Sequence, residues 1–140
     1  MPKAYLGRRY HFAAAHRLHS AALDAERNRE VYGKCNNPHG HGHNYTAEIV
    51  VAGEVDAVTG MVCDLAEMDA FAQARMVEVF DHQNLNTLER FRNRVPTTEN
   101  LCMEIYRIFQ QGFHGARLVL VRVEETERNS FEYAGERETT

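Results

Sequence analysis

Residues 32–45 read YGKCNNPHGHGHNY, and this stretch opens the most regular segment of the chain. From residue 41 to residue 52 the odd positions carry histidine, histidine, tyrosine and then only aliphatic residues. This period of two predicts a strand with one buried face. On a strand, side chains two residues apart point the same way, with Cβ atoms about 6 to 7 Å apart, so His41 and His43 can bind one metal ion.

A second alternating segment, residues 9–16, supplies another histidine. Every second residue forms one face: Tyr10, Phe12, Ala14 and His16. We expect this strand to pair with the first as an antiparallel neighbour, which would bring His16 to the same face as His41 and His43. Three neutral imidazoles with a fourth position left open are typical of a catalytic zinc site.

The pattern leaves two other ligand sets open. His39 lies two residues before His41, so it can replace another histidine in the set. Cys35, in the polar loop before the strand, can act as a fourth ligand and close the site into a structural one. Otherwise a metal cation and Lys34 are expected to lower the pKa of Cys35, which would make it a thiolate base or nucleophile.

The middle of the chain predicts two helices. Residues 17–40 have no clean period and form a long connection that can hold a short helix around residues 21–30. Asp64 and Glu67 resemble a capping box that starts a helix ending near Phe80.

The C-terminal half predicts the second helix and two more strands. Thr97 caps a helix that runs to about residue 111, and Gly112 sits where a C-terminal stop is expected. Residues 116–125 and 130–134 alternate as strands, with a turn between them. The order ββααββ predicts an α+β layer fold.

Length and composition restrict the class of protein. The 140 residues match one domain, residues 1–140, and 44% hydrophobic with 26% charged residues is typical of a globular chain. The formal net charge of −4, with acids and bases interspersed, argues against a nucleic-acid partner. No apolar run is long enough for a membrane span, and the N-terminus lacks the apolar core of a secretory signal, so we expect a cytoplasmic protein with free thiols.

Asp81, His82 and Glu125 are further candidates for site residues. Asp81 can hold the neighbouring His82 in one tautomer, although an acid and a histidine at a helix end are also common as a simple charge pair. Glu125 shares a face with valines on the third strand, where it is either a solvated edge acid or a buried one. A buried carboxylate there can accept two N–H bonds from a guanidine-like ring edge, as in a pterin or purine.

Together these residues resemble the 6-pyruvoyl-tetrahydropterin synthase family, and the run CNNPxGHGHNY is the most specific feature. The matching stretches follow in order along nearly the whole chain: FAAAHRLHS (12–20), YGKCNNPHGHGHNY (32–45), TGMVCDL (59–65), DHQNLN (81–86), PTTEN (96–100) and VEET (123–126).

The resemblance implies the tunnelling fold, in which a four-stranded antiparallel sheet carries two helices on one face. It also implies trimeric barrels that join into a homohexamer, with active sites between subunits. It implies Zn²⁺ on His16, His41 and His43. The other implied site residues are the catalytic Cys35, Asp81 and His82, the pterin anchor Glu125, and the pocket-lining Thr97, Thr98 and Glu99.

The implied activity is that of a lyase that converts 7,8-dihydroneopterin triphosphate to 6-pyruvoyltetrahydropterin and triphosphate. Mg²⁺ can accompany the triphosphate, and Arg17 or Lys34 can supply the cationic neighbours that it needs. No nucleic acid or membrane is expected as a partner.

Two other functions compete with this one. His39 permits the Cys-x-x-x-His-Gly-His spacing of the related 6-carboxytetrahydropterin synthases of queuosine biosynthesis, which release acetaldehyde. The flanking GKCNNP and NY favour the pyruvoyl alignment. A non-catalytic, zinc-stabilised pterin-binding protein is a hypothesis of another class, and it requires the closed site with Cys35 as fourth ligand.

Overall fold

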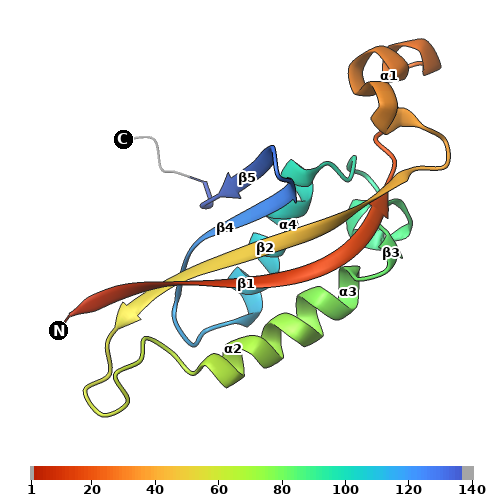
Figure 1. The fold of residues 1–140 in the computed structure, drawn as a ribbon. Coiled ribbons are helices and arrows are strands. Elements are labelled where there is room, and N and C mark those ends of the chain that lie inside the picture. Colours follow the sequence, from red (N-terminus) through yellow and green to blue (C-terminus); the bar gives the residue numbers. More distant parts are fainter. Residues whose placement is uncertain (1, 137–140) are drawn as a thin grey trace.

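The computed structural model, which describes residues 2–136, is an α+β structure with helices packed on one face of a twisted sheet (Figure 1). Four strands form an antiparallel sheet: β1 (Lys3–His16), β2 (His41–Glu54), β4 (Arg117–Thr126) and β5 (Asn129–Tyr133). A two-residue strand, β3 (Gln83–Asn84), is added parallel to β1 at the outer edge. The predicted fold class is confirmed, with this short fifth strand as a difference.

The strands β1 and β2 pair along their whole length, as predicted, from Lys3 opposite Glu54 to His16 opposite His41. β1 starts six residues before the predicted strand. The alternation did not reveal this first part because polar side chains occupy part of its inner face. Arg8 and Tyr10 both reach Asp69 on the covering helix, and Arg8 Nη2 lies 2.6 Å from Asp69 Oδ2. A carboxylate partner thus substitutes for apolar packing in this part of the strand.

The first covering helix is continuous over three segments: α2 (Leu65–Ala72), a π-helical turn (Gln73–Val77) and α3 (Glu78–Phe80). Asp64 caps it by accepting the backbone N–H groups of Ala66 and Glu67, as the sequence predicts. Its apolar stripe enters the core. Two short 3₁₀ turns follow, Leu85–Thr87 and Glu89–Phe91.

The second covering helix, α4 (Thr98–Gly112), begins at the predicted cap, since Thr97 Oγ1 accepts the N–H of Asn100 at 3.1 Å. It ends at Gly112, but not because this glycine adopts a left-handed conformation. A Cβ on Gly112 would lie 2.7 Å from the Phe71 ring, so the glycine permits the two helices to approach. The position of the helix end is confirmed, and its physical reason is corrected.

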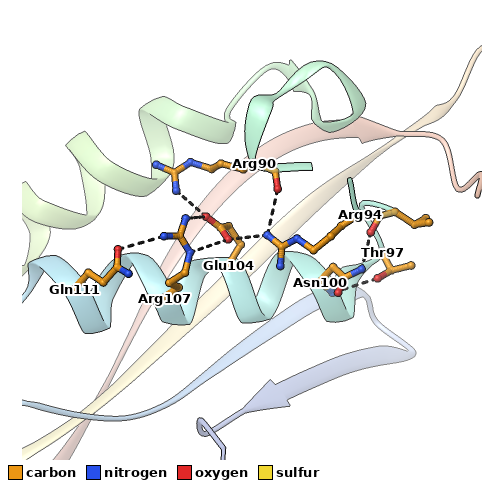
Figure 2. A network of polar contacts seen from close by, with 8 residues as sticks. Arg90, Arg94, Thr97, Asn100, Glu104, Arg107 and Gln111 are labelled. Atoms are coloured by element: carbon orange, nitrogen blue, oxygen red, sulfur yellow. Dashed lines mark hydrogen bonds and ion pairs between the residues drawn. The ribbon is translucent and has the colours of Figure 1, made fainter. Parts of the chain in front are cut away.

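One carboxylate is buried within α4. Glu104 is 1% exposed and accepts hydrogen bonds from Arg90, Arg94 and Arg107 (Figure 2). Burial alone would raise the pKa of Glu104, but the three guanidinium groups outweigh burial and lower the pKa to about 2. The network attaches residues 89–94 to the helix.

The long connection between β1 and β2 contains α1 (Ala25–Tyr32), which projects beyond the end of the sheet (Figure 1), and a 3₁₀ turn (Gly33–Asn36). The helix starts four residues later than expected. Asn28 is fully buried and its amide bonds three carbonyl groups of the preceding turn, which holds the helix without an apolar core. None of the helices in the described residues has the length and hydropathy to cross a bilayer.

Candidate metal centre and active site

Three histidines meet where β1 ends and β2 begins. His16 lies opposite His41 in the strand register, and His43 follows on the same face of β2. One nitrogen from each ring lies within 4.8 Å of the other two, and His16 Nε2 is 3.2 Å from His41 Nε2. Tetrahedral zinc with Zn–N bonds of about 2.0 to 2.1 Å places its ligand nitrogens roughly 3.3 Å apart. The residues therefore fit a metal ion.

The protonation of His16 is determined by the backbone. Its Nδ1 lies 2.8 Å from the carbonyl oxygen of Pro96, and a carbonyl can only accept, so Nδ1 carries the proton. The lone pair on Nε2 then points into the cluster, and metal-ligating histidines commonly donate their other ring N–H to a backbone carbonyl in this way. Burial also lowers the pKa of His16, which favours the neutral ring that a metal requires.

His43 is the member of the cluster whose polar atom lacks a partner. Its Nε2 is buried and makes no hydrogen bond with the described residues. Burial lowers the pKa of His43 as well. An unpaired buried nitrogen is costly in a folded protein, and a cation between the rings would satisfy it.

Glu125 of β4 lies against this cluster. Its Oε1 is 3.2 Å from His43 Nε2 and 3.5 Å from His16 Nε2, outside hydrogen-bond geometry but within ionic contact. Its side chain is 14% exposed, so it is neither a solvated edge acid nor fully buried. Any ligand group that Glu125 contacts must therefore lie close to the imidazoles.

Cys35 stands beside the cluster rather than in it. Among the described residues the histidines alone form a group with ligand atoms this close, and His39 is exposed and outside it. Cys35 and His41 line a cavity of about 700 Å³. Burial, and then the charge of Glu125, raise the pKa of the Cys35 thiol in the protein alone, so a thiolate there needs the nearby cation.

Asp81 and His82 form a pair that is docked on β1. Asp81 Oδ1 accepts the N–H of Ala13 at 2.9 Å, and Asp81 Oδ2 lies 2.9 Å from His82 Nδ1. The bond from Ala13, and then the contact with His82, keep the pKa of Asp81 below its usual range. Asp81 is also the C-terminal cap of α3. The two residues therefore lie at a helix end and also form an acid–histidine pair, and both predicted arrangements are present.

His82 adopts a left-handed backbone conformation with φ of 59°, the single non-glycine residue in the described chain with positive φ. Such a conformation costs about 1 to 3 kcal/mol, and residues held in it cluster at active sites and ligand clamps. It is held by the bond from His82 N to Ala13 O, at 2.6 Å. His82 is 83% exposed, and it lines a second cavity of about 390 Å³ together with His43.

The segment 97–99 contacts the three histidines only indirectly. Pro96, which binds His16, directly precedes it, and Thr97 uses its hydroxyl to cap α4. Thr98 is buried with a hydroxyl that has no partner among the described residues, whereas Glu99 is exposed. Neither the cavity at Cys35 nor that at His82 is lined by these three residues.

The structure adds residues that sequence reasoning missed. The carbonyl oxygen of Pro96 contacts His16 itself. The side chains of Asn36 and Asn86 bond the backbone of the two residues that follow His16. All of these contacts join residues at least 18 positions apart, so no local pattern could reveal them. The motifs DHQNLN and CNNP contained the two asparagines without indicating their partners.

The fold and the site define a class of protein: an α+β enzyme-like domain with a candidate mononuclear metal centre of three histidines at one end of its sheet. Comparison then assigns the family. The family model for 6-pyruvoyl tetrahydropterin synthase matches residues 5–136, and the chain belongs to this family.

Individual relatives agree with this assignment. The chain is 43% identical over 136 residues to 6-pyruvoyl tetrahydrobiopterin synthase of Drosophila melanogaster, covering 96% of this chain and 81% of the relative. It is 42% identical over 133 residues to the protein of the same name from Poecilia reticulata, covering 94% and 90%. The structure of the Caenorhabditis elegans 6-pyruvoyl tetrahydropterin synthase superposes with a TM-score of 0.92 at 39% identity, covering 97% of this chain and 98% of that one.

Proposed function

We propose that this chain is a 6-pyruvoyltetrahydropterin synthase, which converts 7,8-dihydroneopterin triphosphate to 6-pyruvoyltetrahydropterin and triphosphate. One observation carries the proposal. The three-histidine centre is flanked by two cavities, one lined by Cys35 and the other by His82. Each of the two groups proposed for proton transfer therefore lines a cavity that also contains a histidine of the centre, and an internal hydrogen shift requires such groups.

We infer that His16, His41 and His43 hold Zn²⁺ with one position left for substrate. When bound, the ion would polarise the side-chain hydroxyl oxygens of the substrate and acidify the adjacent C–H groups. The position of Cys35 outside the histidine group favours this open site over the closed, purely structural one.

Cys35 is proposed as the base that takes the proton from the substrate side chain. Its raised pKa means that the protein alone keeps the thiol protonated, so its activation is linked to the cation at the histidines. His82 is proposed to transfer protons on the other side of the substrate, with Asp81 holding its Nδ1 and leaving Nε2 free.

Glu125 is proposed to bind the pterin ring edge, and Thr97, Thr98 and Glu99 to line the ring pocket. The contact of Glu125 with His43 means that the bound ring would lie close to the metal. For the triphosphate, with or without Mg²⁺, we propose the cavity at Cys35. The predicted Arg17 and Lys34 both line it, and Arg29 of α1 adds a third cation.

We further propose that residues 1–140 act as one domain in a cytoplasmic homohexamer, a dimer of trimers with sites between subunits. Two features support this assembly. Residues 3–12 of β1 have no strand on their outer side in the described structure, and β5 leaves the opposite edge open. The high exposure of His82 also fits a site that a neighbouring subunit completes. The three cysteines are free, in keeping with a reducing compartment.

The test is a mass-spectrometric product assay with zinc-loaded protein, 7,8-dihydroneopterin triphosphate and Mg²⁺. The pyruvoyl product with release of triphosphate is expected. The carboxy product with acetaldehyde would instead assign the chain to the queuosine branch. Absence of turnover, with metal bound and the fold intact, would favour the non-catalytic binding protein.

A further inference from the structure

The side-chain amide of Asn86 makes two hydrogen bonds to the backbone just beyond His16. We propose that Asn86 is a positioning residue for Cys35: it fixes the residue pair Arg17–Leu18, to which the Cys35 loop is attached. The inference rests on the proposed function for its catalytic consequence, but its structural part is independent of turnover.

Asn86 is itself held firmly against β1. The preceding segment docks through Asp81 and His82 on Ala13, and β3 then pairs Gln83 with Ala14 and Asn84 with Ala15. Asn84 Oδ1 accepts the N–H of Asn86 at 3.0 Å, and the adjacent Leu85 is fully buried. The amide of Asn86 therefore starts from a fixed point on the sheet.

The contact with Arg17 continues the strand pairing with a side chain. The register pairs residue 15 with residue 84, so residue 17 comes opposite residue 86. There the Asn86 Oδ1 accepts Arg17 N at 2.7 Å, and Asn86 Nδ2 donates to Arg17 O at 2.8 Å. An amide side chain presents the same donor and acceptor as a peptide unit, so it can hold the chain after both strands have ended.

The other side of this segment binds the cysteine loop. Leu18 N donates to Cys35 O at 2.8 Å, and Arg17 Nε donates to Asn36 O at 3.1 Å. Asn36 Nδ2 returns a bond to Leu18 O at 2.7 Å. Residues 17 and 18 are therefore fixed between Asn86 on one side and Cys35–Asn36 on the other.

This arrangement explains how a loop cysteine can have a defined place beside the histidines. Cys35 lies in a short 3₁₀ turn after the projecting α1 and has no strand or covering helix of its own to hold it. Besides the chain that leads on to β2, hydrogen bonds to Leu18 and Arg17 attach Cys35 and Asn36 to the segment that directly follows His16. Displacement of a reacting group by about 1 Å can cost on the order of 100-fold in rate, so the outer support matters.

The test compares Asn86→Ala with Asn86→Asp and with the matched control Thr87→Ala. Thr87 bonds Asn84 O in the same turn and has no bond to Arg17. Asn86 is exposed, so we expect all three variants to fold. In Asn86→Ala, amide hydrogen exchange at Arg17 and Leu18 should become at least about tenfold faster. The rate at which iodoacetamide alkylates Cys35 should also change, and peptide mass spectrometry measures this rate.

The kinetic expectation is a fall in kcat of about tenfold or more for Asn86→Ala, with KM changed by less than about threefold and zinc content retained. Asn86→Asp keeps the acceptor for Arg17 N, so it should preserve exchange protection at Arg17 and restore part of kcat. Thr87→Ala should match the wild type in every readout.

Unchanged exchange at Arg17 and Leu18 in Asn86→Ala would overturn the proposal, as would equal effects of Thr87→Ala. If exchange and alkylation change while the wild type turns over no pterin, the positioning contact stands and the proposed function fails.

Discussion

Glu104 is a buried carboxylate that accepts hydrogen bonds from three guanidinium groups (Figure 2). Replacing it by Gln would leave these cations in place with weaker acceptors. We expect Glu104→Gln to lower the free energy of unfolding by about 2 to 3 kcal/mol, less than for a fully buried set because the arginines reach water. Urea denaturation measures the free energy of unfolding. As a control, Glu89→Gln, which removes one partner of an exposed ion pair, should change this free energy by less than about 0.5 kcal/mol.

The same residue predicts an acid-dependent loss of stability. The folded pKa of about 2 lies below the ordinary value of 4.5, so the contribution is complete above about pH 4.5 and is lost as the pH falls towards 2. Unfolding curves at several pH values should therefore converge for the wild type and Glu104→Gln under acid conditions. Parallel pH dependences would show that Glu104 is not held ionised.

Cys35 predicts a separation of metal binding from activity. Cys35→Ala should retain zinc, because the histidine group is complete without it, and should lose at least about 100-fold in activity. Metal analysis by mass spectrometry and the product assay measure the two effects. His43→Ala provides the contrast, since it should lose the metal. Zinc loss in Cys35→Ala would make the thiol a ligand.

Among the elements, the end of α4 depends on a close contact rather than on a glycine conformation. A methyl group on Gly112 would meet the Phe71 ring at 2.7 Å, so either this ring or the helix that carries it would have to move. We expect Gly112→Ala to cost about 1 to 3 kcal/mol by overpacking, seen as a lower thermal midpoint. The exposed neighbour offers a control, since Gln111→Ala should be nearly neutral.

The elements that the sequence predicts well are those set by local chemistry. The caps at Asp64 and Thr97, and the alternation of β2, depend on neighbours within a few residues. The elements missed, β3 and the first half of β1, depend on distant partners such as Ala14 and Asp69. The late start of α1 follows from the Asp24 cap and the buried Asn28, whose bonds no periodicity reports.

The candidate site divides in the same way. The spacing of His41 and His43 on one strand predicted two ligands, and the pairing of β1 with β2 added His16. The support from Pro96 and Asn86 joins residues 80 and 69 positions apart in sequence, so it emerges only from the folded chain. The pKa of Cys35 could not be predicted locally either. Burial raises it, and so does the charge of Glu125, which lies on the distant strand β4.

At the scale of the whole molecule, the exposure of His82 and the open sheet edges predict sites that two subunits share. Cys35→Ala and His82→Ala, each inactive alone, should regain activity when unfolded, mixed in equal amounts and refolded together. If the two groups of one site come from different subunits, about one quarter of the sites in random mixtures would be intact. No recovery in a confirmed mixed oligomer would place both groups in one chain.

The bond from His16 to the carbonyl of Pro96 also has an evolutionary consequence. A metal ligand oriented by a carboxylate side chain loses its support through a single codon change. Here the acceptor is a main-chain oxygen, which every amino acid supplies, so substitutions at residue 96 cannot delete it and can only shift it. The tautomer of His16 is thereby robust to mutation, and drift in this part of the sequence is limited by the path of the backbone rather than by the identity of a side chain.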